Sequence, residues 1–351
     1  MPGKLTVVLS ADFLDENHQP VFPDIGLSTI EGRQDLESRF LPEYRPEYTA
    51  DQLEDADVLL SLKPRVTAAS LVGVERLCAI GRYGVGYDNV DLRACTEHDI
   101  AVYITRGAVV RPVASSIVLL VLAASHRLVW KDRLMRRGEW AASTRKLGRE
   151  PRGRVFGTIG LGAIAREAIR LLKPFEISKF LAYDPFVGPE KAAELGVERM
   201  GLDELLSASD YVAVNCPLTP ETRKLIGERE LRLMKQDAIL INTARGPIVD
   251  EAALARVLAE GAIAGAALDV FEQEPLPAAS PLVGLENIIL SSHSLCWSEE
   301  LFRDMGREAF AGVLQIAAGR APRHVVNTDV LERAGFRRKL ERLQEALETN
   351  Q

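Results

Sequence analysis

The chain has 351 residues, a net charge of −7, and a composition that is 47% hydrophobic and 26% charged. This length allows two domains with separate cores, and the composition is that of an ordinary globular protein. The acidic balance argues against general nucleic-acid binding, and the four cysteines have neither disulfide nor metal-site spacing. With no signal peptide and no apolar run of membrane-spanning length, we expect a reduced, cytoplasmic protein without a metal or a membrane partner.

The first part of the chain alternates short apolar runs with helical stretches. The runs are expected to be strands and cover residues 5–10, 58–60, 77–82 and 100–104. This alternation predicts a parallel α/β unit over about the first 105 residues. After the third run, a glycine-containing turn over residues 81–91 could present backbone N–H groups to an anion. It could equally be a loop that needs glycine only for its backbone conformation.

A long helix is predicted over residues 113–128, a segment that is apolar on nearly every side. Such a helix should be buried. Pro112 suits its first turn, and His126 near its end is expected to cap or pack rather than to bind a ligand. The segment that follows, residues 127–154, has ten basic residues against three acidic ones. We expect it to be a solvated arm, although its charge could also favour anionic ligands nearby.

Residues 154–184 carry the strongest local signal. An apolar run leads into Gly160-Leu161-Gly162, and a helical stretch and a second apolar run follow before Asp184. Strand, glycine turn, helix, strand and acid in this order form the dinucleotide-binding fingerprint. A purely structural glycine turn is the alternative, but the context favours a cofactor.

Each fingerprint residue has a physical role in that interpretation. Gly160 permits the tight turn, and Gly162 lets the backbone approach a pyrophosphate at the helix N-terminus. Ala165 keeps helix and strand close. Asp184 would bind the adenosine ribose and would repel a 2′-phosphate, so NAD is favoured over NADP.

Beyond Asp184 the strand–helix pattern continues. The expected strands are 155–159, 180–183, 211–215, 238–242, 266–270 and 288–291. Six strands are the number in a doubly wound dinucleotide domain, where ligands bind beyond the carboxyl ends of the strands. A long helix is expected over residues 297–319, and the charged tail that follows is expected to be a surface or packing helix.

Three polar residues near those strand ends suggest a chemistry. Arg245 could hold a substrate carboxylate bidentately. His293 could exchange a hydroxyl proton near neutral pH, and Glu274 could orient the imidazole and favour its charged form. Together they are what hydride transfer at a 2-hydroxy acid needs. Each also has a structural alternative: a surface arginine, a loop histidine and a solvated acid.

The chain resembles the D-isomer-specific 2-hydroxyacid dehydrogenases, which include D-3-phosphoglycerate dehydrogenase and glyoxylate/hydroxypyruvate reductase. The matching motifs are RYGVGYDNVDL, IGLGAIA with Asp184, CPLTPETRKLIG, INTARGPIVDE, AALDVFEQEPLP and the His293 loop. They extend from about residue 80 to residue 300. The resemblance implies an NAD-dependent oxidoreductase that moves hydride between NAD(H) and a D-2-hydroxy acid or 2-keto acid.

The resemblance also implies roles for individual residues. Arg245 would anchor the substrate, His293 would be the acid/base, and Glu274 would be its partner. The implied cofactor contacts are Gly160, Leu161, Gly162, Ala163, Ile164, Asp184, Cys216, Pro217, Thr222, Thr243, Ala244, Arg245, Asp269 and His293. The implied substrate contacts are Arg82, Tyr83, Gly84, Val85 and Arg245.

The expected architecture is a Rossmann cofactor domain, residues 106–296, inserted into a discontinuous flavodoxin-like substrate domain. Residues 1–105 form the first part of the substrate domain, and residues 297–351 complete it with a C-terminal helix and tail. The resemblance implies a homodimer formed largely through the cofactor domain and the arm after the first long helix.

Two departures from the family pattern affect the choice of substrate. The segment Thr105–Ser115 lacks the usual Pro, Asn and Glu, and Ser294–Trp297 replaces the usual small residues after the histidine. We hypothesise that Arg82, Arg106 or Arg111 meets a second anionic or polyhydroxylated end of the substrate; otherwise the three are solvated or hinge-packing arginines. An NAD(H)-sensing interaction protein, like the C-terminal-binding corepressors, is the alternative function.

Overall fold

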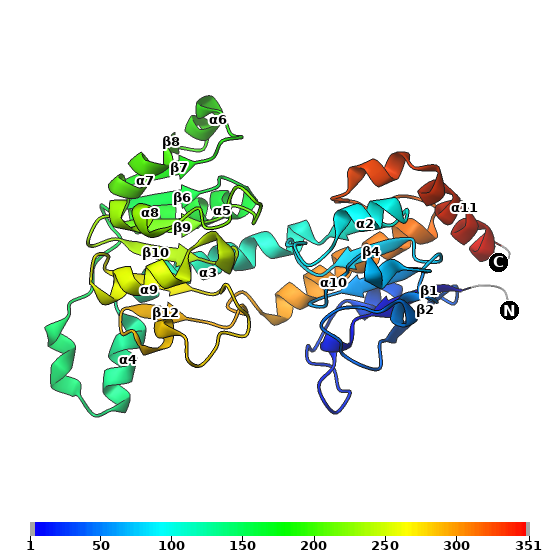
Figure 1. The fold of residues 1–351 in the computed structure, drawn as a ribbon, viewed down its shortest axis with the longest axis horizontal. Coiled ribbons are helices and arrows are strands. Elements are labelled where there is room, and N and C mark those ends of the chain that lie inside the picture. The colour runs from blue at the N-terminus through cyan, green and yellow to red at the C-terminus, as the bar shows by residue number, and fades with distance from the viewer. Residues whose placement is uncertain (1–3, 349–351) are drawn as a thin grey trace. The chain divides into compact units, whose positions relative to one another are not determined.

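A computed structural model describes residues 4–348, which divide into two compact units. Unit 1 comprises the chain up to Val109 and from Trp297 onward, and unit 2 comprises Val110–Cys296. Figure 1 shows a parallel sheet with flanking helices in each of them. The predicted class, two doubly wound α/β domains, is confirmed.

The sheet of unit 1 has five parallel strands in the order β2-β1-β3-β4-β5. This is the flavodoxin-like order. Its strands are β1 (Leu5–Leu9), β2 (Leu36–Phe40), β3 (Val58–Ser61), β4 (Ala79–Arg82) and β5 (Ala101–Ile104). The sequence did not predict β2, because this edge strand carries the polar residues Glu37, Ser38 and Arg39 between its apolar ends.

The helices of unit 1 come from both ends of the chain. They are α1 (Ala50–Leu53), α2 (Leu92–Glu97), α10 (Glu299–Ala317) and α11 (Ala334–Glu348). Helix α11 buries Phe336, Leu340 and Leu343, which confirms that the tail contains a packing helix.

A buried carboxylate ties α11 to the sheet. Asp57, 1% exposed, lies within 2.7 Å of Arg76 and 3.3 Å of Arg342, a residue of α11. It also accepts the N–H of Thr6 in β1. The side chain of Asn327 accepts a hydrogen bond from the N–H of Val102 and donates one to the carbonyl of Ile100. These bonds hold the chain after α10 to the edge strand β5.

The sheet of unit 2 has seven strands in the order β12-β11-β10-β9-β6-β7-β8. They are β6 (Val155–Ile159), β7 (Lys179–Tyr183), β8 (Glu198–Arg199), β9 (Tyr211–Val214), β10 (Ile239–Asn242), β11 (Gly265–Leu268) and β12 (Ile288–Leu290). Counted from β6, the order is the 3-2-1-4-5-6 of a dinucleotide-binding sheet plus one strand. The six-strand prediction omitted β8, which has only two residues, both exposed.

Helices cover both faces of this sheet. Leucines of α7 (Leu202–Ala208), α8 (Glu228–Leu233) and α9 (Glu251–Ala259) pack on one face. Residues of α3 (Arg106–Ser125), α5 (Ala163–Leu172) and α6 (Pro189–Glu194) pack on the other. Because both faces are covered, the central strands are mostly apolar, and the polar residues that they do contain, Thr158 of β6 and Asn242 of β10, are buried.

Helix α3 corrects two predictions. It begins at Arg106, so Pro112 lies inside the helix rather than in its first turn. This helix is also long and apolar enough to cross a membrane by length and composition, contrary to the expectation that no such run exists. Ala114, Ile117 and Val121 are nevertheless fully buried in unit 2, as expected of a core helix. After Arg127, which has a left-handed backbone, the arm continues as α4 (Leu128–Arg136).

Candidate active site

The glycine turn after β6 is held by a close backbone approach at Gly160 and by hydrogen bonds to Asp184. Gly160 has φ +94°, and a Cβ there would crowd the backbone of Asn215. Its N–H donates to the carbonyl of Tyr183 at 2.8 Å, and the N–H of Leu161 donates to Asp184 Oδ2 at 2.8 Å. Asp184 Oδ1 accepts the N–H of Phe186 at 2.9 Å. The acid of the fingerprint is thus oriented by backbone groups on both sides.

The N-terminus of α5 has room for a ligand. Gly162 is the N-cap without a side-chain cap, and a Cβ built on it would meet nothing within 4 Å. N–H groups at such an end carry partial positive charge and suit a pyrophosphate. Ala163 and Ile164, the first residues of the helix, are half-buried beside them.

A second polar group lacks a protein partner near the end of β10. The hydroxyl of Thr243 is buried and has no hydrogen-bond partner in the part of the chain that the structure describes. Buried hydroxyls normally have a partner. The Thr243 hydroxyl and the N–H groups at the N-terminus of α5 fit a dinucleotide cofactor, whose oxygens would accept hydrogen bonds from both.

The loop after β9 is ordered by its own hydroxyls. Thr222 donates to the carbonyl of Pro217 at 2.7 Å and accepts the N–H of Thr219 at 2.7 Å. Its side chain therefore shapes the loop. Burial raises the pKa of the neighbouring Cys216 to about 11, so this residue presents a neutral thiol.

The loop after β10 positions Arg245 by two devices. The buried side chain of Asn242 accepts the N–H of Ala244 and donates to the carbonyl of Arg245, both at 3.0 Å. A Cβ at Gly246 would overlap the backbone of Phe271, so this glycine lets the Arg245 loop lie directly against the loop that carries Glu274. Neither Asn242 nor Gly246 was predicted from the sequence. An Asn that ends a strand is a signal for such a turn.

Glu274 and His293, 19 residues apart, are brought into contact. His293 Nδ1 lies 2.7 Å from Glu274 Oε2, while Glu274 Oε1 accepts the N–H of Phe271 at 3.0 Å. Burial acts to raise the pKa of Glu274, but the effects that lower it, of which the hydrogen bond and charge of His293 are the largest, together outweigh burial, and the pKa lies below its ordinary value. The ionised carboxylate fixes Nδ1 as the protonated nitrogen and leaves Nε2 for proton exchange. Arg245 contributes to the same lowering through its charge.

The loop that carries His293 is anchored by Asp269. This carboxylate, 4% exposed, accepts the hydroxyl of Ser291 at 2.6 Å and the N–H groups of Ser294 and Leu295. His293 itself has a left-handed backbone at φ 55°, an unusual conformation for a residue with a side chain. Such conformations persist where surrounding contacts determine them, and they cluster at functional sites.

In unit 1, some backbone N–H groups of the turn after β4 are hydrogen-bonded within the protein and others are not. The N–H of Gly84 donates to Thr105 Oγ1 at 2.8 Å, and the side chain of Tyr83 is buried with its hydroxyl on the carbonyl of Ile25. Within residues 4–348, the N–H groups of Val85 and Gly86 donate to no protein acceptor. If this turn receives an anion, these two groups are the ones available.

The three arginines proposed for a second anion have different surroundings. Arg82 donates to the carbonyl of Tyr83 at 2.5 Å and to Asn89 Oδ1 at 3.3 Å, so it braces its own turn. Arg111 forms an ion pair with Glu167 at 2.9 Å, and hydrogen bonds from Arg170 and Arg111 lower the pKa of Glu167 to about 2. Arg106 is exposed at the start of α3.

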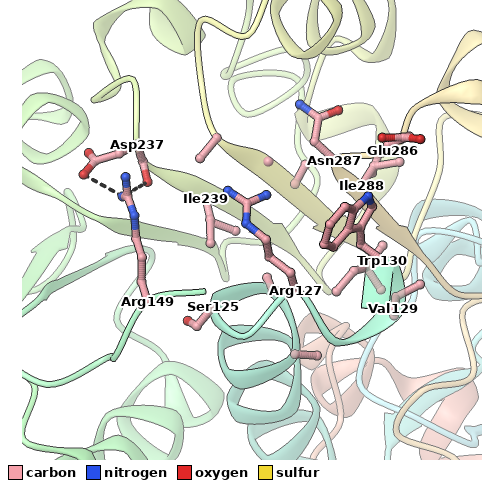
Figure 2. A pocket seen from close by; sticks show the side chains of 16 residues that line it. Ser125, Arg127, Val129, Trp130, Arg149, Asp237, Ile239, Glu286, Asn287 and Ile288 are labelled. Atoms are coloured by element: carbon pink, nitrogen blue, oxygen red, sulfur yellow. Dashed lines mark hydrogen bonds and ion pairs between the residues drawn. The ribbon is translucent and has the colours of Figure 1, made fainter. Parts of the chain in front are cut away.

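Unit 2 also contains a hollow, which Figure 2 shows with the side chains that line it. It is lined by Ile239 and Ile288 at the amino ends of β10 and β12, and by Trp130 of the arm. Arg149 forms the hydrogen bond and ion pair with Asp237 drawn there. Because the candidate residues of unit 2 lie at the carboxyl ends of the strands, this hollow is not part of their site. No cluster of metal-ligating side chains occurs among the described residues.

Comparison with known proteins gives a consistent family. Residues 118–294 match the family described as D-isomer specific 2-hydroxyacid dehydrogenase, NAD binding domain. A glyoxylate reductase of Korarchaeum cryptofilum (strain OPF8) is 37% identical over 316 residues, covering 88% of this chain and 95% of the relative. A D-3-phosphoglycerate dehydrogenase of Methanocaldococcus jannaschii is 38% identical over 279 residues, covering 79% of this chain but only 53% of that relative.

Solved structures agree. The TT0316 protein from Thermus thermophilus superimposes with a TM-score of 0.79 at 30% identity, covering 92% of this chain and 99% of that one. A glyoxylate reductase from Paecilomyes thermophila gives a TM-score of 0.76 at 26% identity, covering 90% and 95%.

Proposed function

The chain belongs to the D-isomer-specific 2-hydroxyacid dehydrogenases and is an NAD-dependent enzyme of that family, and from this premise we propose how its residues act. The reaction interconverts a small 2-keto acid and the D-2-hydroxy acid, with His293 as the acid/base. The observation that carries the proposal is the 2.7 Å contact between His293 Nδ1 and Glu274 Oε2.

When bound, NADH supplies the hydride that is added to C2 of the keto acid. His293 then protonates the alkoxide oxygen from Nε2, because Nδ1 is engaged by Glu274. Glu274 stabilises the imidazolium before the proton leaves. Arg245 binds the substrate carboxylate, and its guanidinium can do so bidentately. In the oxidation direction the same imidazole accepts the hydroxyl proton.

The remaining binding roles follow the same pattern. The helix end at Gly162–Ile164 receives the pyrophosphate, and Asp184 binds the adenosine ribose. Leu161, Cys216, Pro217, Thr222, Thr243, Ala244 and Asp269 line the cofactor site in this proposal. The turn Tyr83–Val85 receives the substrate carboxylate through backbone N–H groups, and the donor free for this is that of Val85.

The test is NADH oxidation with a panel of 2-keto acids, together with NADH binding measured by fluorescence. We expect turnover with glyoxylate, pyruvate or hydroxypyruvate and formation of the D-enantiomer. Tight NADH binding without turnover on any acid would contradict the proposal and favour the sensing protein. The relatives named above are reductases and dehydrogenases and give that alternative no support.

The same panel tests the hypothesis of a second anchor. If Arg82, Arg106 or Arg111 meets a second anionic group, phosphorylated and dicarboxylic keto acids should be preferred by about 10–150-fold, the effect of one hydrogen bond to a charged group. Alanine at the responsible arginine should remove the preference. Equal use of pyruvate, unaffected by all three substitutions, would exclude this role.

We also propose a homodimer formed largely through the cofactor domain and the arm after the first long helix. Several large apolar side chains of α3, α4 and the segment after them are exposed: Leu119, Leu128, Met135, Trp140 and Leu147. Exposed apolar surface marks interaction sites where it is contiguous, and these five side chains come from elements that are consecutive in the chain. Light scattering should give twice the chain mass, and Trp140→Glu with Leu147→Glu should give the monomer mass. A monomeric wild type would contradict the proposal.

A further inference from the structure

The hollow drawn in Figure 2 has mostly apolar walls and lies at the amino ends of three strands of unit 2. Ile239, Gly265 and Ile288 begin β10, β11 and β12, and all three line it. Val129 and Trp130 of α4 line it as well. The hollow encloses about 50 Å³, which is room for about four water-sized groups. The candidate active-site residues follow the opposite ends of the same strands, so the hollow is a separate place.

One cation in the hollow has no anionic partner. Arg127 Nε donates to the carbonyl of Leu147 at 3.0 Å, and among residues 4–348 the side chain forms no ion pair. Figure 2 shows the guanidinium pointing into the hollow, between Ile239 and Trp130. Because Nε holds the side chain in place, the two terminal nitrogens of the guanidinium remain as donors toward the hollow.

The other charged side chains that line the hollow are compensated. Arg149 forms an ion pair with Asp237 at 2.6 Å. Glu286 forms an ion pair with Lys146 of the arm at 3.3 Å. The charge of Arg127 is therefore the net charge of the hollow, and it favours an anion.

The position of Arg127 is fixed by the surrounding backbone. Its φ of 54° is left-handed, a conformation that favours glycine and that persists in other residues where neighbouring contacts determine it. The two ends of the arm meet beside it: the N–H of Arg149 donates to the carbonyl of Ser125 at 2.8 Å, and a Cβ at Gly148 would lie 2.9 Å from the same oxygen. The guanidinium is thus held before a ligand arrives, which lowers the entropy lost on binding.

A fixed guanidinium beside apolar walls suits a ligand with one carboxylate and a short hydrocarbon chain. The terminal nitrogens match the two oxygens of a carboxylate, and the walls receive the chain. We propose that the hollow is a binding site for a small aliphatic monocarboxylate, distinct from the sites for cofactor and substrate. The volume of the hollow limits the buried part of the chain to about four carbon atoms.

The test uses isovalerate as the probe and Trp130 as the local reporter. Fluorotryptophan is incorporated into the full chain, and the fluorine NMR signals of Trp130, Trp140 and Trp297 are assigned by single Trp→Phe substitutions. Of the three, only Trp130 lines the hollow. Isovalerate should shift the Trp130 signal in a saturable way and leave the other two unchanged. Isovaleramide, which has the same shape without the charge, should bind about 10-fold or more weakly.

The variants separate this site from the active site. Arg127→Gln should weaken isovalerate by about 10–150-fold and bring it close to isovaleramide. Arg145→Gln is the matched control, because this exposed arginine of the same arm does not line the hollow. Arg245→Gln, in the candidate active site, should also leave the Trp130 titration unchanged. If Arg127→Gln does not fold, the comparison of acid and amide on the wild type decides.

Four results would overturn the proposal. They are the absence of a saturable shift at Trp130, equal binding of isovalerate and isovaleramide, a titration that Arg127→Gln leaves unchanged, and a titration that Arg245→Gln abolishes. The last result would assign the binding to the active site. The first is also expected if a second copy of the chain fills the hollow.

Discussion

Two carboxylates, Asp57 in unit 1 and Glu274 in unit 2, have similar hydrogen-bond partners but differ in how exposed they are and in whether their basic partner can lose its charge. Each accepts one backbone N–H and faces a basic side chain. Asp57 is 1% exposed and binds two arginines, which hold their charge at all relevant pH values. Glu274 is 38% exposed and binds a histidine, which can lose its proton. Burial with permanent cations makes Asp57 a structural link between elements. We propose that exposure and a titrating partner instead suit Glu274 and His293 to proton transfer.

The comparison predicts that removing His293, the partner of Glu274, lowers the catalytic rate but leaves the free energy of unfolding nearly unchanged. His293→Asn should lower kcat by roughly 10²–10⁴-fold, the usual contribution of a general acid, and leave NADH binding nearly unchanged. Single-turnover NADH oxidation measures this directly. His126→Asn, an exposed histidine at the end of α3, is the control and should keep wild-type kcat. A His293→Asn enzyme with more than half the wild-type rate of hydride transfer would remove His293 from the mechanism.

Loss of Asp57 should affect stability and not rate. Asp57→Ala leaves the buried N–H of Thr6 and the guanidiniums of Arg76 and Arg342 without their acceptor. Because both arginines keep access to water, the free energy of unfolding should fall by about 3 kcal/mol. This is the lower end of the range for removing one partner of a buried ion pair. Urea unfolding measures it.

The control for Asp57 lies two residues away. Asp55 is exposed and pairs with the exposed Arg39. Asp55→Ala should change the free energy of unfolding by less than about 1 kcal/mol. Similar values for both substitutions would mean that the tie between α11 and the sheet contributes little.

The charge of Glu274 can be removed while the size and shape of the side chain are kept. Glu274→Gln should move the basic limb of the kcat/KM profile for keto-acid reduction to lower pH by up to about one unit, because a neutral amide no longer favours the imidazolium. The profile of Glu272→Gln, an exposed neighbour, should match the wild type. An unchanged limb in Glu274→Gln would show that Glu274 does not support the charged form.

The smallest expected effect is that of the Glu274 pair on stability. Because the pKa of Glu274 is lowered in the folded chain, the pair contributes at pH values above the ordinary carboxyl pKa and the contribution disappears as the pH falls through the lowered value. Both side chains are more than a third exposed, so the difference between wild type and Glu274→Gln should stay below about 1 kcal/mol at pH 7. Unfolding at pH 7 and near pH 3 tests the sign; a difference that grows on acidification would contradict it.

The elements predicted from the sequence are strands that form short apolar runs and helices with apolar residues at helical spacing. Strand β6, the Gly160 turn and α5 follow from local chemistry, since a tight turn and a strand-to-helix change are visible in consecutive residues. Strand β8 could not be predicted, because two exposed residues carry no periodicity and join the sheet only through β7. Helix α3 extends through Pro112 although local preference would begin the helix there.

In the candidate site, the sequence identified residue types but not their mutual positions. Gly246 faces the backbone of Phe271, and Asp269 anchors the loop of His293; both contacts depend on how separate strands end at one edge. The orientation of Arg82 toward Tyr83 and Asn89 was equally hidden, because a charged residue at a strand end suggests a ligand as readily as a brace.

The central claim is that His293 and Glu274 act as one unit in proton transfer, and a double-mutant cycle tests it most directly. The rate of hydride transfer in a single turnover with saturating NADH and keto acid is measured for the wild type, His293→Asn, Glu274→Gln and the double variant. Residues that act together are strongly non-additive. Because Glu274 acts only through the imidazole in this account, removing Glu274 from His293→Asn should cost little more. The rate of the double variant should be within about 3-fold of the rate of His293→Asn. Multiplication of the two single losses in the double variant would contradict the account.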